Sequence, residues 1–368
     1  MKSLKLTIVA GARPNFMKVA PIIHAIQRQQ VAGVDIHFRL IHTGQHYDTI
    51  MSGAFFEQLN IPAPHGNLEA GGGTQAEQTA AIMAKFEQEL LSNPPDCVIV
   101  VGDVTSTMAC TLAAVKLNIK VAHVEAGIRS YDRSMPEEVN RIVVDSICNL
   151  YYTTTEEASR QLVMEGVDDD KIVFVGNTMV DTLVENLDRL VPPKFWNDQS
   201  LSHQNYLLLT LHRPSNVDNP ILFQQKIDVI ARETESWPVI FPVHPRTQKN
   251  MQLAGINVPK NIRLVDPLGY LEFMYLLKNA KGVITDSGGI TEEATFLGVP
   301  CMTLRSTTER PETCSVGTNV LIGDDFNMLS KHLRELLQGN WKSSSIPKLW
   351  DGQAAERIVE DLISRSPF

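Results

Sequence analysis

The chain is poor in cysteine. It holds five cysteines in 368 residues, an odd number, and no two of them have C-x-x-C spacing. Most of them lie in apolar segments, where a free cysteine is commonly buried. The sequence therefore favours reduced thiols in the core over a disulfide framework or a metal or redox site. The five residues are Cys97, Cys110, Cys148, Cys301 and Cys314.

An excess of basic residues and a long hydrophobic run are also lacking. The chain has 33 Lys and Arg against 42 Asp and Glu, a net charge of −9, which opposes sequence-independent binding to nucleic-acid phosphates. No run approaches the ~20 apolar residues of a membrane span. The first residues lead into a strand pattern rather than a signal-peptide core. We therefore expect a cytoplasmic protein with no nucleic-acid or membrane partner.

What the chain does have is an alternation of short apolar runs with longer helical patterns. This alternation is typical of βαβ units, so we predict an α/β fold. The length predicts two domains. Pro192 and Pro193 cannot continue a helix and mark the candidate passage between them. We predict two Rossmann-like, doubly wound parallel sheets facing a central cleft, in residues 1–175 and 176–352. The predicted strands are 5–10, 36–41, 97–101, 121–123, 171–175, 206–211, 239–243, 262–265, 282–285 and 300–303.

Ligands of such sheets bind outside the carboxyl ends of the strands. The first strand ends at Gly11, and Arg13 and Lys18 follow beside a helix start, a geometry suited to a phosphate or a carboxylate. A surface turn with solvated cations explains the same residues. The chain has neither G-x-G-x-x-G after this strand nor G-x-x-x-x-G-K-[ST], which disfavours a nicotinamide dehydrogenase and a P-loop kinase.

Two carboxylates follow neighbouring strands of the first domain. Asp103 comes after strand 97–101 and Glu125 after strand 121–123. Like charge and desolvation raise the pKa of such a pair, which suits acid/base chemistry. Alternatively, Asp103 caps a helix and Glu125 pairs with Arg129. Glu137 belongs to a further acidic pair, which could equally complement a helix dipole.

In the second domain, Ser287, Gly288 and Gly289 form a glycine turn between a strand and a helix. Their N–H groups would face an anion such as a diphosphate, and Glu293 could reach sugar hydroxyls. An ordinary βα turn remains possible. His212 and His244 each come directly after a strand and stand beside an arginine. Each is either a polar side chain whose hydrogen bonds are satisfied or a catalytic residue. Arg310 could clamp a phosphate or pair with Glu309 or Glu312. We predict no metal site, because the ten histidines show no ligand spacing.

Nine blocks in one order resemble the non-hydrolysing UDP-N-acetylglucosamine 2-epimerases over nearly the whole chain. The blocks are Gly11-Ala12-Arg13-Pro14 with Lys18, Thr43-Gly44-Gln45-His46, Gly102-Asp103, His123-Val124-Glu125-Ala126-Gly127, Pro136-Glu137-Glu138 with Asn140-Arg141, Gly176-Asn177-Thr178, Pro242-Val243-His244-Pro245, Asp286-Ser287-Gly288-Gly289 and Thr308-Glu309-Arg310-Pro311-Glu312, before a terminal Asp351-Gly352-Gln353-Ala354. The resemblance implies a glycosyltransferase-B-like pair of domains, with the last helix, within 353–368, packing back on the first domain. It also implies a homodimer.

The family interconverts UDP-GlcNAc and UDP-ManNAc by eliminating UDP across C1 and C2 and adding it back to a 2-acetamidoglucal, with no cofactor. By resemblance, the acid/base residues are Asp103, Glu125 and Glu137, while Lys18 and His212 support departure of the diphosphate. The residues that bind the UDP-sugar are then Arg13, His244, Phe273, Ser287, Gly288, Gly289, Glu293 and Arg310.

Two positions depart from the family pattern. Asn15 stands where Glu is usual, and Leu268 stands where a Gln near the nucleobase is expected. The alternatives are a 2-epimerase of a diacetamido uronic acid nucleotide, a retaining glycosyltransferase of the same architecture, and a non-catalytic nucleotide-sugar sensor. The loop Gln45-His46-Tyr47-Asp48 and the segment 71–75 also lack the cation that would hold a second, activating UDP-GlcNAc. We therefore expect no requirement for that activator.

Overall fold

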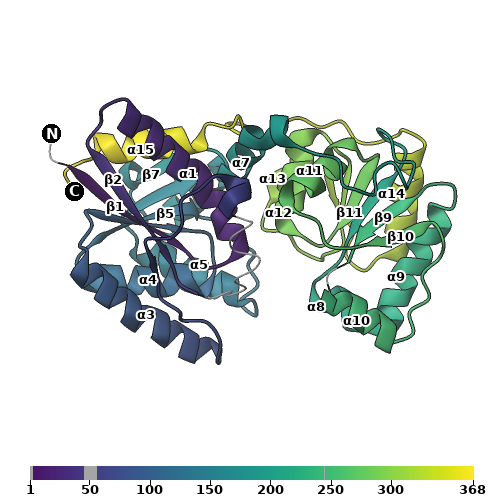
Figure 1. The fold of residues 1–368 in the computed structure, drawn as a ribbon, viewed down its shortest axis with the longest axis horizontal. Helices are drawn as coiled ribbons and strands as arrows, with labels where there is room; N and C mark the ends of the chain where they lie inside the picture. Colours follow the sequence, from purple (N-terminus) through teal and green to yellow (C-terminus); the bar gives the residue numbers. More distant parts are fainter. Residues whose placement is uncertain (1–2, 45–55, 244) are drawn as a thin grey trace. The chain divides into compact units, whose positions relative to one another are not determined.

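A computed structural model describes residues 3–44, 56–243 and 245–368. They form two compact units, each built on a parallel sheet with helices on both faces (Figure 1). Unit 1 contains residues 1–185 and 348–368, and unit 2 contains residues 186–347. The structure confirms the predicted α/β class with two doubly wound sheets. None of the described helices is long and apolar enough to cross a membrane.

The sheet of unit 1 has seven strands in the order β3-β2-β1-β4-β5-β6-β7. Its central strands β1 and β4 are almost wholly buried, which explains their continuous apolar runs. The strands are β1 (Leu4–Ala10), β2 (Ile36–His42), β3 (Gly66–Asn67), β4 (Cys97–Val101), β5 (Lys120–Ala126), β6 (Leu150–Thr153) and β7 (Ile172–Phe174). The helices are α1 (Arg13–Val31), α3 (Gln75–Ser92), α4 (Thr105–Lys116), α5 (Pro136–Ile147), α6 (Glu156–Met164), α7 (Thr178–Asn186) and α15 (Ala354–Ser364).

The last helix, α15, packs beside α1 in unit 1 (Figure 1). Its apolar side buries Ile358, Val359 and Leu362. Helix α7 also belongs to this unit, because Thr182 donates a hydrogen bond to the Met17 carbonyl of α1. The structural boundary between the units therefore lies at residue 185, in the last turn of α7, a helix that the sequence assigned to the second domain.

The sheet of unit 2 has six strands in the order β10-β9-β8-β11-β12-β13. Helices α9 and α14 pack together over one face of the sheet, and α11 and α12 lie on the other (Figure 1). The strands are β8 (Leu207–Thr210), β9 (Val239–Pro242), β10 (Ile262–Val265), β11 (Gly282–Thr285), β12 (Cys301–Thr303) and β13 (Asn319–Leu321). The helices are α8 (Pro214–Val217), α9 (Pro220–Glu233), α10 (Pro245–Leu253), α11 (Tyr270–Asn279), α12 (Gly288–Leu297), α13 (Pro311–Ser315) and α14 (Phe326–Leu337).

Both strand orders reverse at one point. In unit 1 the reversal falls between β1 and β4, and in unit 2 it falls between β8 and β11. The connections after two adjacent strands diverge there, which leaves a crevice at their carboxyl ends. Lys18 and Asp103 follow the two strands of the first switch point, and His212 and Asp286 follow those of the second.

Candidate functional site

In unit 1, Glu125 forms an ion pair with Lys18 of α1. Glu125 lies near the end of β5, where the pairing with β6 shifts register between Val124 and Ala126. Its φ is +70°, a conformation that non-glycine residues rarely adopt and that often marks a functional position. The bulge turns the Glu125 side chain toward α1, as bulges do beside many active sites.

Gly102 makes room for this pair. A Cβ atom at Gly102 would lie 3.2 Å from Glu125 Oε2 and 3.4 Å from Lys18 Nζ, and the φ of Gly102 is +68°. Space and backbone conformation thus both favour glycine directly after β4. Asn15 closes the preceding turn, because its Oδ1 accepts from the Ala12 N–H at 3.0 Å and its Nδ2 donates to the Val101 carbonyl at 3.0 Å.

Asp103 is held by α5. Arg141 donates to the Asp103 carboxylate at 2.5 Å, and Asn140 donates to the Asp103 carbonyl at 2.8 Å. The helix-cap alternative for Asp103 is wrong, because α4 has Val104 as its N-cap and no side-chain cap bond. Asp103, directly after β4, and Glu125, near the end of the adjacent strand β5, are therefore each paired with a cation.

The two acidic residues at the start of α5 lie in different environments. Glu138 is buried and accepts hydrogen bonds from the backbone N–H groups of Ser130 and Tyr131 at 2.9 and 2.8 Å. Burial alone would raise the pKa of Glu138, but these bonds and the Arg141 guanidinium outweigh it and lower that pKa. Glu137 lies in the first turn of α5 and is half-buried.

A buried network that the sequence did not predict supports this cluster. His123 bonds to Asp145 at 2.6 Å through Nδ1 and to the Gly102 carbonyl at 2.9 Å through Nε2. Arg129 donates to Asp145 at 2.7 Å and also pairs with Glu165, so the alternative pairing of Glu125 with Arg129 is wrong. Burial alone would raise the pKa of Asp145, but its contacts with His123 and Arg129 outweigh burial and lower that pKa.

In unit 2, His212 bonds to the fully buried carboxylate of Asp286. His212 Nδ1 lies 2.8 Å from Asp286 Oδ1. The carboxylate also accepts from the Arg213 N–H at 2.9 Å and from Asn216 Nδ2 at 3.0 Å. Burial alone would raise the pKa of Asp286, but these donors outweigh it and hold that pKa below its usual value.

The predicted glycine turn forms the N-terminus of α12. Ser287 is the N-cap, and the helix begins with Gly288 and Gly289. Among atoms of the described residues, a Cβ atom at Gly288 would come within 4 Å only of Arg305 Nη1, at 3.8 Å, so these residues leave the space around Gly288 open. Helix N-termini with open N–H groups bind anions.

The polar loop after β12 contributes two buried arginines. Arg310 Nε lies 2.6 Å from Glu292, its main partner, and Arg310 Nη1 lies 3.9 Å from Glu312. Arg305, which the sequence did not single out, makes a two-pronged contact with Glu309 at 2.7 and 2.8 Å. Both guanidinium groups are therefore close to α12 and largely withdrawn from solvent.

The remaining predicted residues are less connected. Glu293 is buried in α12, and burial together with its charge raises the pKa of Tyr270 well above the usual value. Phe273 is half-buried in α11. His244 and the side chain of Arg13 lie outside the described part of the chain. Among the described residues, no group of three or more His, Cys, Asp or Glu side chains could hold a metal ion.

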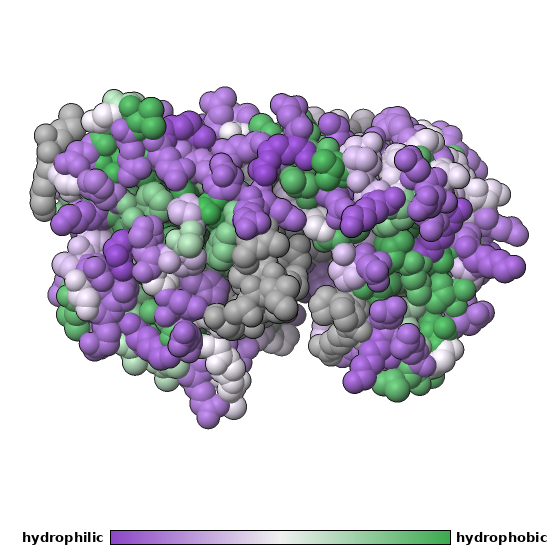
Figure 2. Space-filling view, viewed as in Figure 1, coloured by the Kyte–Doolittle hydropathy of each residue, from purple (hydrophilic) through white to green (hydrophobic). Residues whose placement is uncertain are grey.

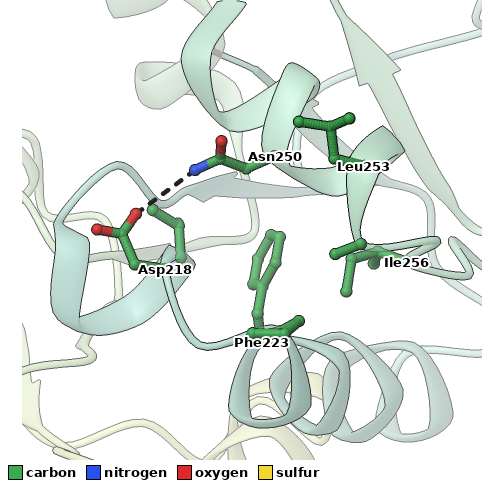
Figure 3. A pocket seen from close by; sticks show the side chains of 8 residues that line it. Asp218, Phe223, Asn250, Leu253 and Ile256 are labelled. Carbon is green, nitrogen blue, oxygen red and sulfur yellow. Dashed lines mark hydrogen bonds between the residues drawn. The ribbon is translucent and has the colours of Figure 1, made fainter.

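A pocket of about 460 Å³ lies elsewhere in unit 2, between α9 and α10. Phe223, Leu253 and Ile256 form much of its wall, and Asn250 donates to Asp218 at 3.5 Å near its edge (Figure 3). Apolar surface gathers over this part of unit 2 on the face drawn in Figure 2. None of the predicted site residues within the described part of the chain lines the pocket.

Comparison with known proteins gives concordant matches. The family model for UDP-N-acetylglucosamine 2-epimerase matches residues 28–363. The UDP-N-acetylglucosamine 2-epimerase of Methanocaldococcus jannaschii is 42% identical over 98% of this chain and 99% of its own length. A UDP-2,3-diacetamido-2,3-dideoxy-D-glucuronate 2-epimerase of Pseudomonas aeruginosa is 37% identical over 98% and 99%.

Solved structures agree with these matches. The crystal structure of the M. jannaschii UDP-GlcNAc 2-epimerase in complex with UDP-GlcNAc and UDP has a TM-score of 0.86 at 42% identity, covering 98% of this chain and 100% of that one. The lipopolysaccharide outer core galactosyltransferase WaaB, at 15% identity and a TM-score of 0.56 over 98% and 100%, shares the fold alone.

Proposed function

The chain belongs to the UDP-N-acetylglucosamine 2-epimerase family, and from this premise we propose that it interconverts UDP-GlcNAc and UDP-ManNAc without a cofactor. The M. jannaschii relative, at 42% identity, carries the name of this activity. The structural observation that supports the proposal is the pair Asp103 and Glu125. Asp103 follows β4, Glu125 lies near the end of the adjacent strand β5, and each is held by a cation.

The proposed reaction needs a base, an acid and a site for a leaving diphosphate. A base takes the proton from C2 of the sugar while the C1–O bond to UDP breaks, which gives 2-acetamidoglucal and UDP. An acid then delivers a proton to the other face of C2 as UDP adds back to C1. Removing an unactivated C–H proton requires positioned acid/base groups and stabilisation of the leaving charge.

The unit 1 residues suit the proton transfers. The ion pair with Lys18 lets Glu125 enter the reaction as a carboxylate, and Asp103 is paired with Arg141 in the same way. We assign acid/base roles to Asp103, Glu125 and Glu137. Glu138 is committed to Arg141 and to two backbone N–H groups, which makes it a structural neighbour rather than a participant.

The unit 2 residues suit the diphosphate. The N–H groups at the start of α12 supply donors. The Asp286 carboxylate accepts from His212 Nδ1, which leaves His212 Nε2 to face the diphosphate and to donate to it when that nitrogen carries a proton. In this proposal Ser287, Gly288 and Gly289 bind the diphosphate, and Lys18 and His212 assist its departure. Glu293, Phe273, Arg310, Arg13 and His244 bind the rest of the UDP-sugar.

One incubation tests the proposal. Purified protein and UDP-GlcNAc are mixed in D₂O without NAD, and the products are followed by NMR. We expect UDP-ManNAc to appear and deuterium to enter C2 of both sugars. Absence of deuterium after long incubation would exclude the mechanism and would favour a glycosyltransferase or a binding protein. Glu157→Gln is a suitable control, since Glu157 is exposed and pairs only with its neighbour Arg160 among the described residues, so this variant should keep full activity.

A second substrate is supported by one observation, the P. aeruginosa relative named for a diacetamido uronic acid nucleotide. The two substrates differ at C3 and C6, away from the proposed chemistry at C1 and C2. Comparing kcat/KM for UDP-GlcNAc and for UDP-2,3-diacetamido-2,3-dideoxy-D-glucuronate distinguishes them. A higher value for the uronic acid would assign this chain to that branch.

We further propose a cytoplasmic homodimer. The cytoplasmic location is supported by the cysteines, all free and mostly buried, since proteins of oxidising compartments usually pair theirs. The dimer rests on the family resemblance, and light scattering after size-exclusion chromatography tests it.

A further inference from the structure

Helix α9 carries a lysine whose ammonium group is buried. Lys226 is 1% exposed, although a charge inside a protein is costly unless it is paired. Its Nζ lies 2.6 Å from Asn216 Oδ1 and 2.8 Å from Asp324 Oδ1. The Asp324 side chain is 72% exposed. The ammonium therefore has one partner at the surface and one in the interior.

The interior partner, Asn216, has every polar atom engaged. Its Oδ1 accepts from Lys226, and its Nδ2 donates to Asp286 Oδ2 and to the Leu304 carbonyl, both at 3.0 Å. Asp286 and Leu304 offer only acceptors here, so the amide can take one orientation alone. Lys226 completes this arrangement, because without it a buried Asn216 Oδ1 would lose its donor.

Asp286 links Asn216 to His212 by hydrogen bonds. Its Oδ1 lies 2.8 Å from His212 Nδ1, which must therefore carry the hydrogen. The other ring nitrogen, Nε2, is left to face a ligand, and the His212 side chain is 53% exposed. The four residues Lys226, Asn216, Asp286 and His212 thus form one hydrogen-bonded chain from α9 to the end of β8, which we call the Lys226 chain.

We propose that Lys226 and Asn216 are positioning residues for the reaction. They fix the Asp286 carboxylate and, through it, the tautomer and direction of the His212 ring toward the diphosphate. This inference rests on the proposed function, in which His212 assists departure of UDP. A buried ion pair that served stability alone could be replaced by packed apolar residues, so a catalytic effect at Lys226 would be the distinguishing property.

Two variants, one at each residue of the Lys226–Asp324 ion pair, distinguish an effect on catalysis from an effect on stability. Lys226→Met keeps the apolar stem but leaves Asn216 without its donor, whereas Asp324→Asn removes only the exposed partner. We expect Lys226→Met to lower kcat by about tenfold with little change in KM, the size of effect common for coupled neighbours. We expect Asp324→Asn to stay within about twofold of the wild type. Equal kcat values in the two variants would overturn the proposal.

A double-variant cycle ties the effect to His212. In a His212→Asn background, Lys226→Met should cause no further loss of kcat, because the residue that it positions is gone. An undiminished tenfold loss there would show that Lys226 acts through another route. If Lys226→Met does not fold, Asn216→Asp serves instead. It keeps the size of the side chain and the contact with Lys226 but turns an acceptor toward Asp286, so it should lower kcat at least as much.

NMR of the His212 ring gives a result that does not depend on the epimerase activity. Long-range ¹H–¹⁵N spectra of wild type and Asp324→Asn should show one tautomer with the hydrogen on Nδ1. Lys226→Met should show a mixture of tautomers. A single Nδ1–H tautomer in all three proteins would overturn the proposal, whereas failure of the proposed function alone would leave this spectral difference intact.

Discussion

Lys18 and Glu125 form a largely buried ion pair although they lie on different elements, α1 and β5, more than 100 residues apart in the sequence. The contact depends on the bulge in β5 and on the positive φ of Glu125. Strained backbone of this kind costs free energy, of order 1–3 kcal/mol, and persists at functional sites. The pair is therefore the first target for mutation.

Glu125→Gln keeps the shape of the side chain and removes its charge. If Glu125 transfers a proton, kcat should fall by at least the ~10²-fold typical of a lost acid or base. The Kd for UDP, measured by calorimetry, should stay close to that of the wild type, because Ser287, Gly288 and Gly289, the residues proposed to bind the diphosphate, lie in unit 2. Near-normal turnover would reduce Glu125 to a structural partner of Lys18.

Gly288→Leu tests the helix N-terminus as the diphosphate site. The open space in front of Gly288 should let the variant fold, but the leucine side chain would occupy the position of the anion. The leucine side chain would block the anion without being forced into the core, so UDP binding should weaken while the melting temperature changes little. Gly288→Ala is the matched control and should show a smaller effect. Unchanged UDP affinity in Gly288→Leu would place the diphosphate elsewhere.

The stability of the protein should depend on the ionisation of Asp181. Burial raises the pKa of Asp181 to about 7, and its Oδ2 accepts from the Ala355 N–H at 2.7 Å. In the unfolded chain this pKa is about 3.9. The folded state therefore holds the proton more tightly, and the stabilisation present below pH ~4 is lost as the pH rises toward 7, by up to about 4 kcal/mol.

Asp181→Asn should remove this pH dependence. We expect the free energy of unfolding in urea to fall more steeply between pH 5 and pH 8 for the wild type than for the variant. The nearby pair His24 and Glu185 also titrates, but it is present in both proteins and cancels in the difference. Parallel pH profiles would show that Asp181 is ionised in the folded protein throughout this range.

The expected independence from an activator can be tested with UDP-ManNAc freed of UDP-GlcNAc. Residues Gln45–Asp48, on which this expectation partly rests, lie outside the described residues, so it stays a prediction from the sequence. Asp48 adds negative charge where a second anionic ligand would bind. We expect hyperbolic kinetics without a lag. Inactivity that a trace of UDP-GlcNAc relieves would contradict this.

The sequence predicted the fold class and most strands, because buried parallel strands read as apolar runs that end at polar motifs. Asp103 and Glu125 were found in this way. Their partners were not, because Arg141 is 38 residues from Asp103, and periodicity carries no information about which side chains meet. The alternative partner Arg129 was only four residues from Glu125, but the bulge turns the glutamate away from it.

Very short strands and buried chains of hydrogen-bonded side chains could also not be predicted from the sequence. Strand β3 has only two residues, Gly66–Asn67, and neither is apolar, so it gives no strand pattern. Lys226 lies in a helix whose charged positions usually face solvent, and only the fold shows that its ammonium meets Asn216 in the interior. A residue that affects the reaction only through neighbouring side chains gives no motif in the local sequence.

The return of the chain to unit 1 has a consequence for biosynthesis. Unit 2 is one continuous segment, whereas unit 1 needs residues 348–368, including the buried Trp350 and the apolar side of α15. Domains fold as units when their chain has emerged from the ribosome, and contacts between distant residues form slowly. During translation, the unit whose synthesis begins first can therefore reach its final form only after all of unit 2 and then residues 348–368 have been made.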